Sequence, residues 1–276
     1  MGARDVDPNY PAALSFINMH MQPVIAIRHL NKHFGKKQVL MDINLEVRPG
    51  EVIGYIGPNG AGKSTTVKIL IGLLGDYEGD VSVMGHDLRE NTLAVKALTG
   101  YVPENAEIYE VLTPMEYLSF TGKLYGLDED TIAERAQRML QAFGLLENKD
   151  QRMDTFSKGM RQKVLIISGL LHNPQIVILD EPLSGLDANA VIIVKEIITL
   201  LKKENKTIFY CSHMMDVVEK VADRIVLIDE GRIVADGTFR ELQQSGTETL
   251  EQVFARLTGK QRLSEQADQF INALGQ

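Results

Sequence analysis

One stretch of the chain has the composition of a phosphate-binding loop. It consists of Gly57, Pro58, Asn59, Gly60, Ala61, Gly62, Lys63, Ser64 and Thr65. It fits the pattern G-x-x-x-x-G-K-[ST], in which glycines let backbone N–H groups surround a polyphosphate. Lys63 would reach the β- and γ-phosphates, and the Ser64 hydroxyl would bind Mg²⁺. An apolar run at 52–56 predicts a strand before the loop, and 66–71 predicts a helix whose positive end faces the anion. The motif predicts nucleotide binding rather than a glycine-rich turn without a ligand.

Two adjacent carboxylates follow a second apolar run. Residues 176–179 are suited to a strand buried on both faces, and Asp180 and Glu181 come directly after them. The carboxyl end of such a strand lies at the sheet edge where ligands bind. Asp180 would hold Mg²⁺ through a water, and Glu181 would orient and deprotonate an attacking water. The alternative is a solvated turn, which the phosphate loop upstream makes the weaker interpretation.

Two further residues become candidates through their position. His213 follows an expected strand at 207–210, where its imidazole could neutralise a γ-phosphate and bridge it to the base. A lone histidine is more often structural, so only this position favours a role. Ser157 is an N-cap for a helix at 158–171, and the free N–H groups of that helix end would bind an anion that the sequence does not name.

Composition excludes several classes of protein. The 276 residues contain 29 Lys+Arg and 37 Asp+Glu, and the resulting net charge of -8 argues against broad nucleic-acid binding. Cys211 is the single cysteine, so an internal disulfide is impossible. No apolar run approaches the roughly 20 residues that span a bilayer, and no signal peptide is evident. These features predict a cytosolic protein.

The remaining patterns outline the architecture. Residues 1–22 contain Pro8 and Pro11 and are followed by Pro23, and we expect them to be irregular. Helical signals fill 105–172, beginning with Thr113 as an N-cap, and predict a helical insertion. Strands alternating with helices predict a parallel sheet with right-handed crossovers. Amphipathic helices are expected near the end. The expected strands lie at 24–30, 39–47, 81–83, 176–179, 207–210, 224–228 and 232–235; the expected helices lie at 113–125, 128–144, 158–171, 190–203, 250–257 and 264–274.

In their order, these motifs resemble those of the ATP-binding-cassette (ABC) ATPases, over about residues 24–258. The phosphate loop is similar to the family's Walker A, and 176–181 to its Walker B with the catalytic glutamate. Residues 184–187 match the D-loop, and His213 matches the switch histidine. Residues 156–161 stand at the family signature, Phe34 at the aromatic residue that stacks on adenine, and Glu104 at the Q-loop.

Three departures from the family pattern affect the expected chemistry. Glu104 replaces the usual glutamine, so it offers an oxygen near Mg²⁺ but no hydrogen-bond donor. Lys158 replaces the first signature glycine and Met160 the signature glutamine. Ser157 and Gly159 remain, and their hydroxyl and backbone N–H are the groups that a phosphate needs.

The resemblance implies a fold, a domain division and an activity. The fold is α/β, a P-loop NTPase core with a mixed sheet flanked by helices, with an ABC domain at 23–245, a helical subdomain inserted at about 105–172 and a helical extension at 246–276. The activity is hydrolysis of ATP, bound with Mg²⁺, to ADP and phosphate. Lys63, Glu181 and His213 would be catalytic, Ser64, Asp180 and Glu104 would hold Mg²⁺, and Ser157, Gly159 and Asp187 would contact ATP in a second subunit.

The resemblance also implies partners. ATP would close two such subunits head to tail and drive a separate transmembrane permease subunit, which places the protein on the inner face of the cell membrane. The residues at 156–163, together with Glu104, are similar to those of the export branch of the family, which pairs with ABC-2-type membrane subunits. A soluble ABC ATPase acting on ribosomes or DNA and a nucleotide-gated regulatory module are the alternatives. The chain has a single cassette, a short insertion and an excess of acidic residues, which argue against an ATPase acting on ribosomes or DNA. The presence of Glu181 and His213 argues against a regulatory module.

Overall fold

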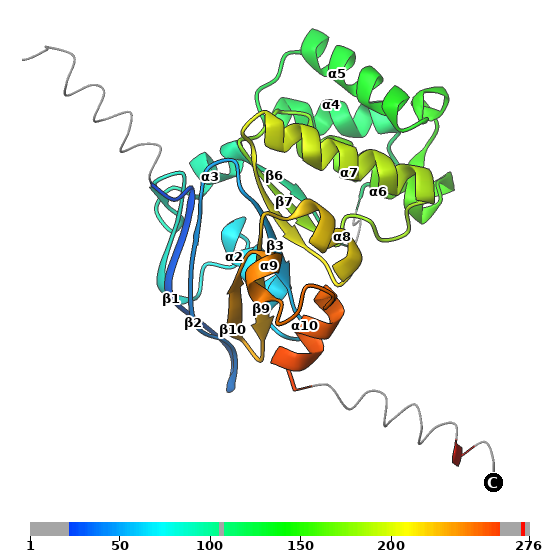
Figure 1. Ribbon diagram of the computed structural model, residues 1–276. Helices are drawn as coiled ribbons and strands as arrows, with labels where there is room; N and C mark the ends of the chain where they lie inside the picture. The colour runs from blue at the N-terminus through cyan, green and yellow to red at the C-terminus, as the bar shows by residue number, and fades with distance from the viewer. Residues whose placement is uncertain (1–21, 105–107, 260–271, 274–276) are drawn as a thin grey trace, which may run out of the picture.

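The computed structural model describes residues 22–104, 108–259 and 272–273. A six-stranded sheet forms its centre, in the order β10-β9-β3-β8-β7-β6 (Figure 1). All neighbours pair in parallel except β9 and β10, which are antiparallel. The strands of this sheet are β3 (Val52–Ile56), β6 (Thr99–Val102), β7 (Ile176–Asp180), β8 (Thr207–Cys211), β9 (Arg224–Asp229) and β10 (Arg232–Gly237).

A second, four-stranded sheet is entirely antiparallel, in the order β2-β1-β4-β5. Its strands are β1 (Ile25–Phe34), β2 (Lys37–Val47), β4 (Glu78–Val83) and β5 (His86–Asp87). The mixed α/β architecture is therefore confirmed. The parallel pairing predicted from the alternation of strands and helices is wrong for these four strands and for β10, because short connections such as the turn at Gly35 return the chain beside its own preceding strand.

Alternate residues of the central strands face two different cores. On one face Val52 and Ile56 of β3 join a cluster with the helices of the insertion; on the other, Ile53 and Tyr55 join a cluster with the antiparallel sheet. Because successive strand side chains point to opposite faces, a strand buried on both must be apolar throughout. All five residues of β3 are buried, as are those of β7 and β8.

The helices cover the two faces of the central sheet. Figure 1 shows α4 and α5 together at the end of the molecule away from β1 and β2, with α6 and α7 beside them. The helices are α2 (Lys63–Leu70), α3 (Thr92–Leu98), α4 (Pro114–Leu124), α5 (Glu129–Ala142), α6 (Lys158–Leu170), α7 (Ala188–Lys203), α8 (Met215–Val221), α9 (Phe239–Leu242) and α10 (Leu250–Leu257), with 3-10 turns at Leu146–Asn148 and Met153–Thr155. Within the described part of the chain, every helix is too short or too polar to traverse a bilayer.

Local capping explains where the inserted helices begin. The Thr113 hydroxyl accepts from the Glu116 N–H at 3.2 Å, and the Glu116 carboxylate accepts from the Thr113 N–H at 2.8 Å. This reciprocal pair satisfies two backbone donors at the start of α4. Asp128 caps α5 in a similar way, and α4, α5 and α6 contact one another. The expected helix at 264–274 and the irregular segment 1–22 lie outside the described residues, apart from 22 and 272–273.

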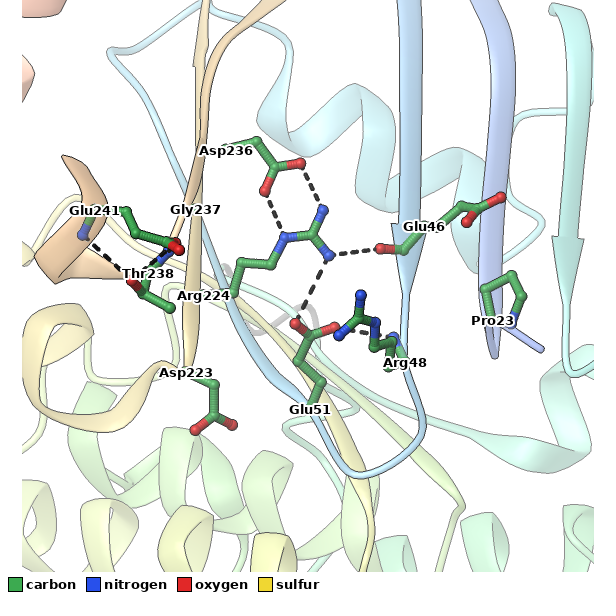
Figure 2. A pocket seen from close by; sticks show the side chains of 10 residues that line it. All are labelled: Pro23, Glu46, Arg48, Glu51, Asp223, Arg224, Asp236, Gly237, Thr238 and Glu241. Carbon is green, nitrogen blue, oxygen red and sulfur yellow. Dashed lines mark hydrogen bonds and ion pairs between the residues drawn. The ribbon is translucent and has the colours of Figure 1, made fainter. Parts of the chain in front are cut away.

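An ion network joins the two sheets at the edge opposite the phosphate loop. Arg224 at the start of β9 donates to both carboxylate oxygens of Asp236 at 2.5 and 2.6 Å and to the Glu46 carbonyl of β2 at 2.8 Å (Figure 2). Glu51 lies 3.7 Å from the same guanidinium. These groups line a hollow of about 1020 Å³. Because each acidic side chain that lines it has a partner within the protein, we assign the hollow to structure rather than to ligand binding.

We predict that Arg224→Met destabilises the fold by about 1–3 kcal/mol, because it leaves partly buried carboxylates without their partner. The side chains of Arg224 and Asp236 are only 24% and 30% exposed. The control is Arg28→Met, which breaks a pair with Glu46 whose side chains are 66% and 58% exposed and which should change stability by less than about 0.5 kcal/mol. Urea unfolding measures both, and equal effects of the two substitutions would contradict this assignment.

Candidate functional site

The phosphate loop connects β3 to α2 and has a backbone that requires glycine. Gly62 is the N-cap of α2 with φ at 111°, a conformation that other residues rarely adopt. A Cβ at Gly62 would also lie 2.6 Å from a methyl carbon of Leu40, and one at Gly57 would lie 2.2 Å from the Ile228 carbonyl. The loop is thus pressed against β2 and β9, and the open N-terminal end of α2 faces its interior.

Lys63 places a positive charge inside the curve of this loop. Its ammonium donates to the carbonyls of Gly57 at 2.7 Å and Pro58 at 3.2 Å, and the residue is only 7% exposed. A lysine held in this way is a fixed point charge beside the helix end, which is the combination that favours a polyphosphate.

A pocket of about 600 Å³ gathers most of the candidate residues. The phosphate loop, the end of β7, the segment after β8 and the end of β1 all contribute to its wall. From the sequence candidates it contains Phe34, Gly57, Pro58, Asn59, Gly60, Gly62, Lys63, Ser64, Thr65, Glu104, Asp180, Glu181 and His213. Ala61 is not among them: it is buried, and its carbonyl accepts from the Gly231 N–H at 3.0 Å.

Three carboxylates crowd one side of this pocket. Asp180, the last residue of β7, is 5% exposed, and its pKa is raised to about 6. Burial is the main cause, and the negative charges of Glu104 and Glu181 add to it, while Lys63 opposes it. Among the described residues no cluster of three or more acidic, histidine or cysteine side chains is arranged to hold a metal ion. A divalent cation beside Asp180 would still relieve part of this repulsion, so Asp180 and the Ser64 hydroxyl fit Mg²⁺ that is also held by a nucleotide's phosphates.

Both carboxylate oxygens of Glu181 are held by neighbouring side chains. His213 Nδ1 lies 2.8 Å from one carboxylate oxygen, and the Ser212 hydroxyl donates to the other at 2.9 Å. The Glu181 N–H donates to the Cys211 carbonyl at 2.9 Å, and its φ of 48° turns the side chain out of the strand. Glu181 is 8% exposed, whereas the His213 side chain is 68% exposed. A carboxylate fixed in this way beside a phosphate loop can take a proton from a water.

The sequence analysis missed several residues of the pocket. Ser212 orients Glu181, and Met215 and Phe254 contribute to the wall. Phe254 belongs to α10, which contacts α8 directly after His213, so the C-terminal helix completes the pocket. The position of Ser212 beside His213 was a usable signal; Phe254 had none, because its role depends on how α10 packs.

Phe34 lies at the edge of the pocket at the end of β1. It is 49% exposed, and the Lys32 ammonium lies 4.9 Å from the centre of its ring. A half-exposed ring that one cation already contacts offers a face on which a planar base can stack.

Three candidates lie outside this pocket. Ser157 caps α6, with its hydroxyl accepting from the Met160 N–H at 3.2 Å, and Gly159 lies against the carbonyl of Gly185. Asp187 uses one carboxylate oxygen to cap α7 at the Ala190 N–H and the other to pair with Lys163. Ser157, Gly159 and Asp187 do not contribute to the wall of this chain's own pocket. A residue that contacts the nucleotide of a second subunit must lie outside that pocket.

These residues fit a Mg²⁺–nucleoside triphosphate. The loop is too close to β2 and β9 for side chains at Gly57 and Gly62, so its interior is lined by backbone groups. Lys63 supplies the cation for the phosphates, the three carboxylates need a positive partner, and Phe34 supplies an exposed ring.

Comparison with known proteins identifies the family. The ABC transporter family profile matches residues 40–184, which include the phosphate loop and both carboxylates. The chain therefore belongs to the ABC transporter family, as an ATP-binding subunit.

Individual relatives agree with this assignment. The linearmycin resistance ATP-binding protein LnrL of Bacillus subtilis is 36% identical over 231 residues, which are 83% of this chain and 74% of LnrL. The ABC transporter ATP-binding protein NatA of the same organism is 36% identical over 224 residues, or 79% of this chain and 91% of NatA. A solved ATP-binding subunit of an ABC transporter superposes with a TM-score of 0.80 and 32% identity, covering 85% of this chain and 99% of that one.

The raised pKa of Asp180 predicts a pH effect on stability. Between about pH 4 and 6 the folded chain holds a proton that the unfolded chain releases, so stability should fall as pH rises through this window. Asp180→Asn removes the buried charge and should raise the unfolding free energy by about 1–3 kcal/mol at pH 7.5 but leave it nearly unchanged at pH 4. Urea unfolding of the nucleotide-free protein at both pH values measures this, and a gain of the same size at pH 4 would show that the ionised form is not the cause.

Proposed function

We propose that this chain is the ATP-hydrolysing subunit of an ABC exporter and that it drives a separate transmembrane subunit. The observation that carries the proposal is the Glu181 carboxylate, held between Ser212 and His213 in the pocket that also contains the phosphate loop. Residues 23–245 would form the ATPase domain, with the helical subdomain at about 105–172. The extension 246–276 would belong to the same functional unit, since Phe254 lines the pocket.

The sequence-predicted residues of the pocket divide the work of hydrolysing ATP to ADP and phosphate. Lys63 and the loop N–H groups bind the phosphates, and Phe34 stacks on adenine. Ser64, Asp180 and Glu104 hold Mg²⁺, which supplies positive charge to the phosphate oxygens when bound. Glu181 removes the proton from water, and His213 orients Glu181 while donating toward the γ-phosphate.

A second copy or a paralogue completes the site. The N-terminal end of α6 at Ser157 and Gly159 is an anion-binding end that lies outside this chain's own pocket. Two chains arranged head to tail would bring Ser157, Gly159 and Asp187 of one to the nucleotide of the other. Closure on ATP and reopening after hydrolysis would then provide the movement that a transporter needs.

An exposed apolar surface supports a membrane partner near the inner face of the cell membrane. Tyr109 and Phe120 contact each other edge to face at 6.0 Å and are 61% and 45% exposed, and Leu124 nearby on α4 is 71% exposed. Side chains of this kind gathered on one face mark a protein contact. The name of LnrL, a resistance protein for linearmycin, supports export as the direction of transport.

We predict that Glu181→Gln lowers ATP turnover by about 10²- to 10⁴-fold, because it removes the general base while keeping the shape of the side chain. The variant should accumulate as an ATP-bound dimer, measured by size-exclusion chromatography with light scattering. Adding Ser157→Arg to it is the control: an arginine at the end of α6 should block closure and keep the chain monomeric. Wild-type turnover by Glu181→Gln would show that the base is misassigned, and a dimer in the double variant would contradict the head-to-tail arrangement.

The partner can be identified with the same trapped state. Glu181→Gln carrying an affinity tag, purified with ATP from detergent-solubilised membranes, should retain a polytopic membrane protein at about one per cassette. Phe120→Ser combined with Leu124→Ser should reduce that recovery without changing ATP turnover of the isolated protein, because both side chains lie outside the pocket. Recovery of ribosomes or DNA instead would overturn the transporter assignment and leave the ATPase assignment in place.

A further inference from the structure

A buried lysine lies against the ring of Phe34. Lys32 and Phe34 are two residues apart in β1, and residues two apart in a strand share a face. The Lys32 ammonium lies over the Phe34 ring, 4.9 Å from its centre. Lys32 is only 4% exposed, whereas Phe34 is half-exposed and lines the pocket with the phosphate loop. One face of the ring is therefore in contact with a buried cation, while the ring stays accessible from the pocket.

The loop between α2 and β4 holds this ammonium in place. The Lys32 ammonium donates to the Asp76 carbonyl and, at 3.2 Å, to the Asp76 carboxylate. The carboxylate is fully exposed, so water screens most of its charge, and the carbonyl is the fixed anchor. Within the described residues, Asp76 accepts all the hydrogen bonds of the Lys32 side chain. The ammonium is thus tied to a loop and covered by the Phe34 ring.

The buried charge of Lys32 needs the ring as a partner. Moving an ammonium out of water costs free energy unless its partners offset that cost, and an apolar side chain would fill the same space without it. A cation over an aromatic face is attracted by the negative potential of the ring, and the attraction is stronger where water is excluded. The Phe34 ring therefore helps to stabilise the charge of Lys32, and Lys32 in turn holds the ring from one side.

This contact changes what the free face of the ring can bind. A half-exposed phenyl ring otherwise samples several rotamers, and fixing the ring before the ligand arrives lowers the entropy cost of binding. The ammonium also draws π-electron density toward its own face, which leaves the opposite face less negative. An electron-rich planar base stacks more favourably on such a face, and a purine offers a larger stacking area than a pyrimidine.

We propose that Lys32 is a positioning residue for the base of the nucleotide and that it acts through Phe34. It fixes the ring in the stacking position and strengthens the stack, so the pocket favours purine over pyrimidine nucleotides. The inference rests on the proposed function, in which Phe34 stacks on adenine. It gives a role to a lysine that does not itself line the pocket.

The test is equilibrium binding of MgADP to the full chain, with magnesium tripolyphosphate as a ligand that lacks the base and the ribose. Lys32→Met keeps the length of the side chain and removes its charge. It should raise the Kd for MgADP about three- to tenfold and leave the Kd for tripolyphosphate within about twofold of wild type. The preference for MgADP over MgCDP should fall as well. A purely structural effect on the phosphate loop would instead weaken MgADP and tripolyphosphate equally.

Matched variants separate the contact with the ring from a general loss of positive charge. Lys32→Arg keeps a cation over the ring and should bind MgADP nearly as wild type does. Lys36→Met removes an exposed lysine from the turn after β1, outside the wall of the pocket, and should change neither Kd.

A double-mutant cycle tests whether Lys32 acts through Phe34. Phe34→Leu removes the ring and should weaken binding of MgADP but not of tripolyphosphate. Adding Lys32→Met to Phe34→Leu should then cause little further loss, because the partner of the cation is already gone. If Lys32→Met folds poorly and loses both ligands, Lys32→Gln replaces it, since the amide keeps a donor for the Asp76 carbonyl and has no charge.

The possible outcomes are distinct. Unchanged binding of MgADP by Lys32→Met would overturn the positioning role. Equal weakening of both ligands in Lys32→Met and Lys32→Gln would also overturn it, as would an equal loss of MgADP affinity from Lys32→Met with and without the ring. If Phe34→Leu alone leaves the Kd for MgADP unchanged, the stacking role in the proposed function fails instead. Binding of neither ligand by the wild-type chain would overturn the proposed function as a whole.

Discussion

The site depends on the register of three parallel strands. β8 lies between β3 and β7, with Cys211 opposite Tyr55 on one side and Asp180 on the other. The phosphate loop, the Asp180-Glu181 pair and the Ser212-His213 pair each follow one of these strands, so they meet at the same sheet edge. Because strand side chains alternate between the two faces, shifting the pairing of one strand by one residue would move each of its side chains to the opposite face. Full burial of all three strands, with side chains packed on both faces, prevents such a shift.

The hollow around Arg224 and the pocket around Asp180 differ in how their charged groups are compensated. Around Arg224 the acidic groups are matched by a guanidinium and by backbone donors, which favours stability. Around Asp180 three carboxylates share one pocket with Lys37, Lys63 and His213; the Lys63 ammonium is bound to carbonyls, and His213 contacts Glu181. The acidic groups of the first hollow have partners within the protein, whereas the raised pKa of Asp180 in the second shows a carboxylate without sufficient compensation. Uncompensated charge, and not volume, distinguishes the functional pocket.

The features that could be predicted from the sequence are those determined by residues close together in the chain. The phosphate loop, the helix starts at Thr113, Asp128 and Ser157, and the buried strand before Asp180 were predictable because each depends on neighbours in the chain. Strands at 24–30, 39–47 and 81–83 were expected, but their assembly with β5 into a separate antiparallel sheet was not predicted, nor were α3 and α8, since these short segments are stabilised by distant partners. Phe254 was missed for the same reason, because its place in the pocket depends on packing that no local pattern encodes, whereas Ser212 stands beside His213 in the sequence.

The central position of β3 determines when the protein can first bind nucleotide. Its neighbours β8 and β9 lie far downstream, and a hydrogen bond from the Val52 N–H to Asp223 joins residues 171 positions apart. At synthesis rates of about 5–20 residues per second, the phosphate loop leaves the ribosome roughly 10–30 s before these strands do. The hairpin of β1 and β2 can fold during that interval, but the loop cannot be fixed. We therefore expect a chain that ends before these strands to lack a fixed ATP site.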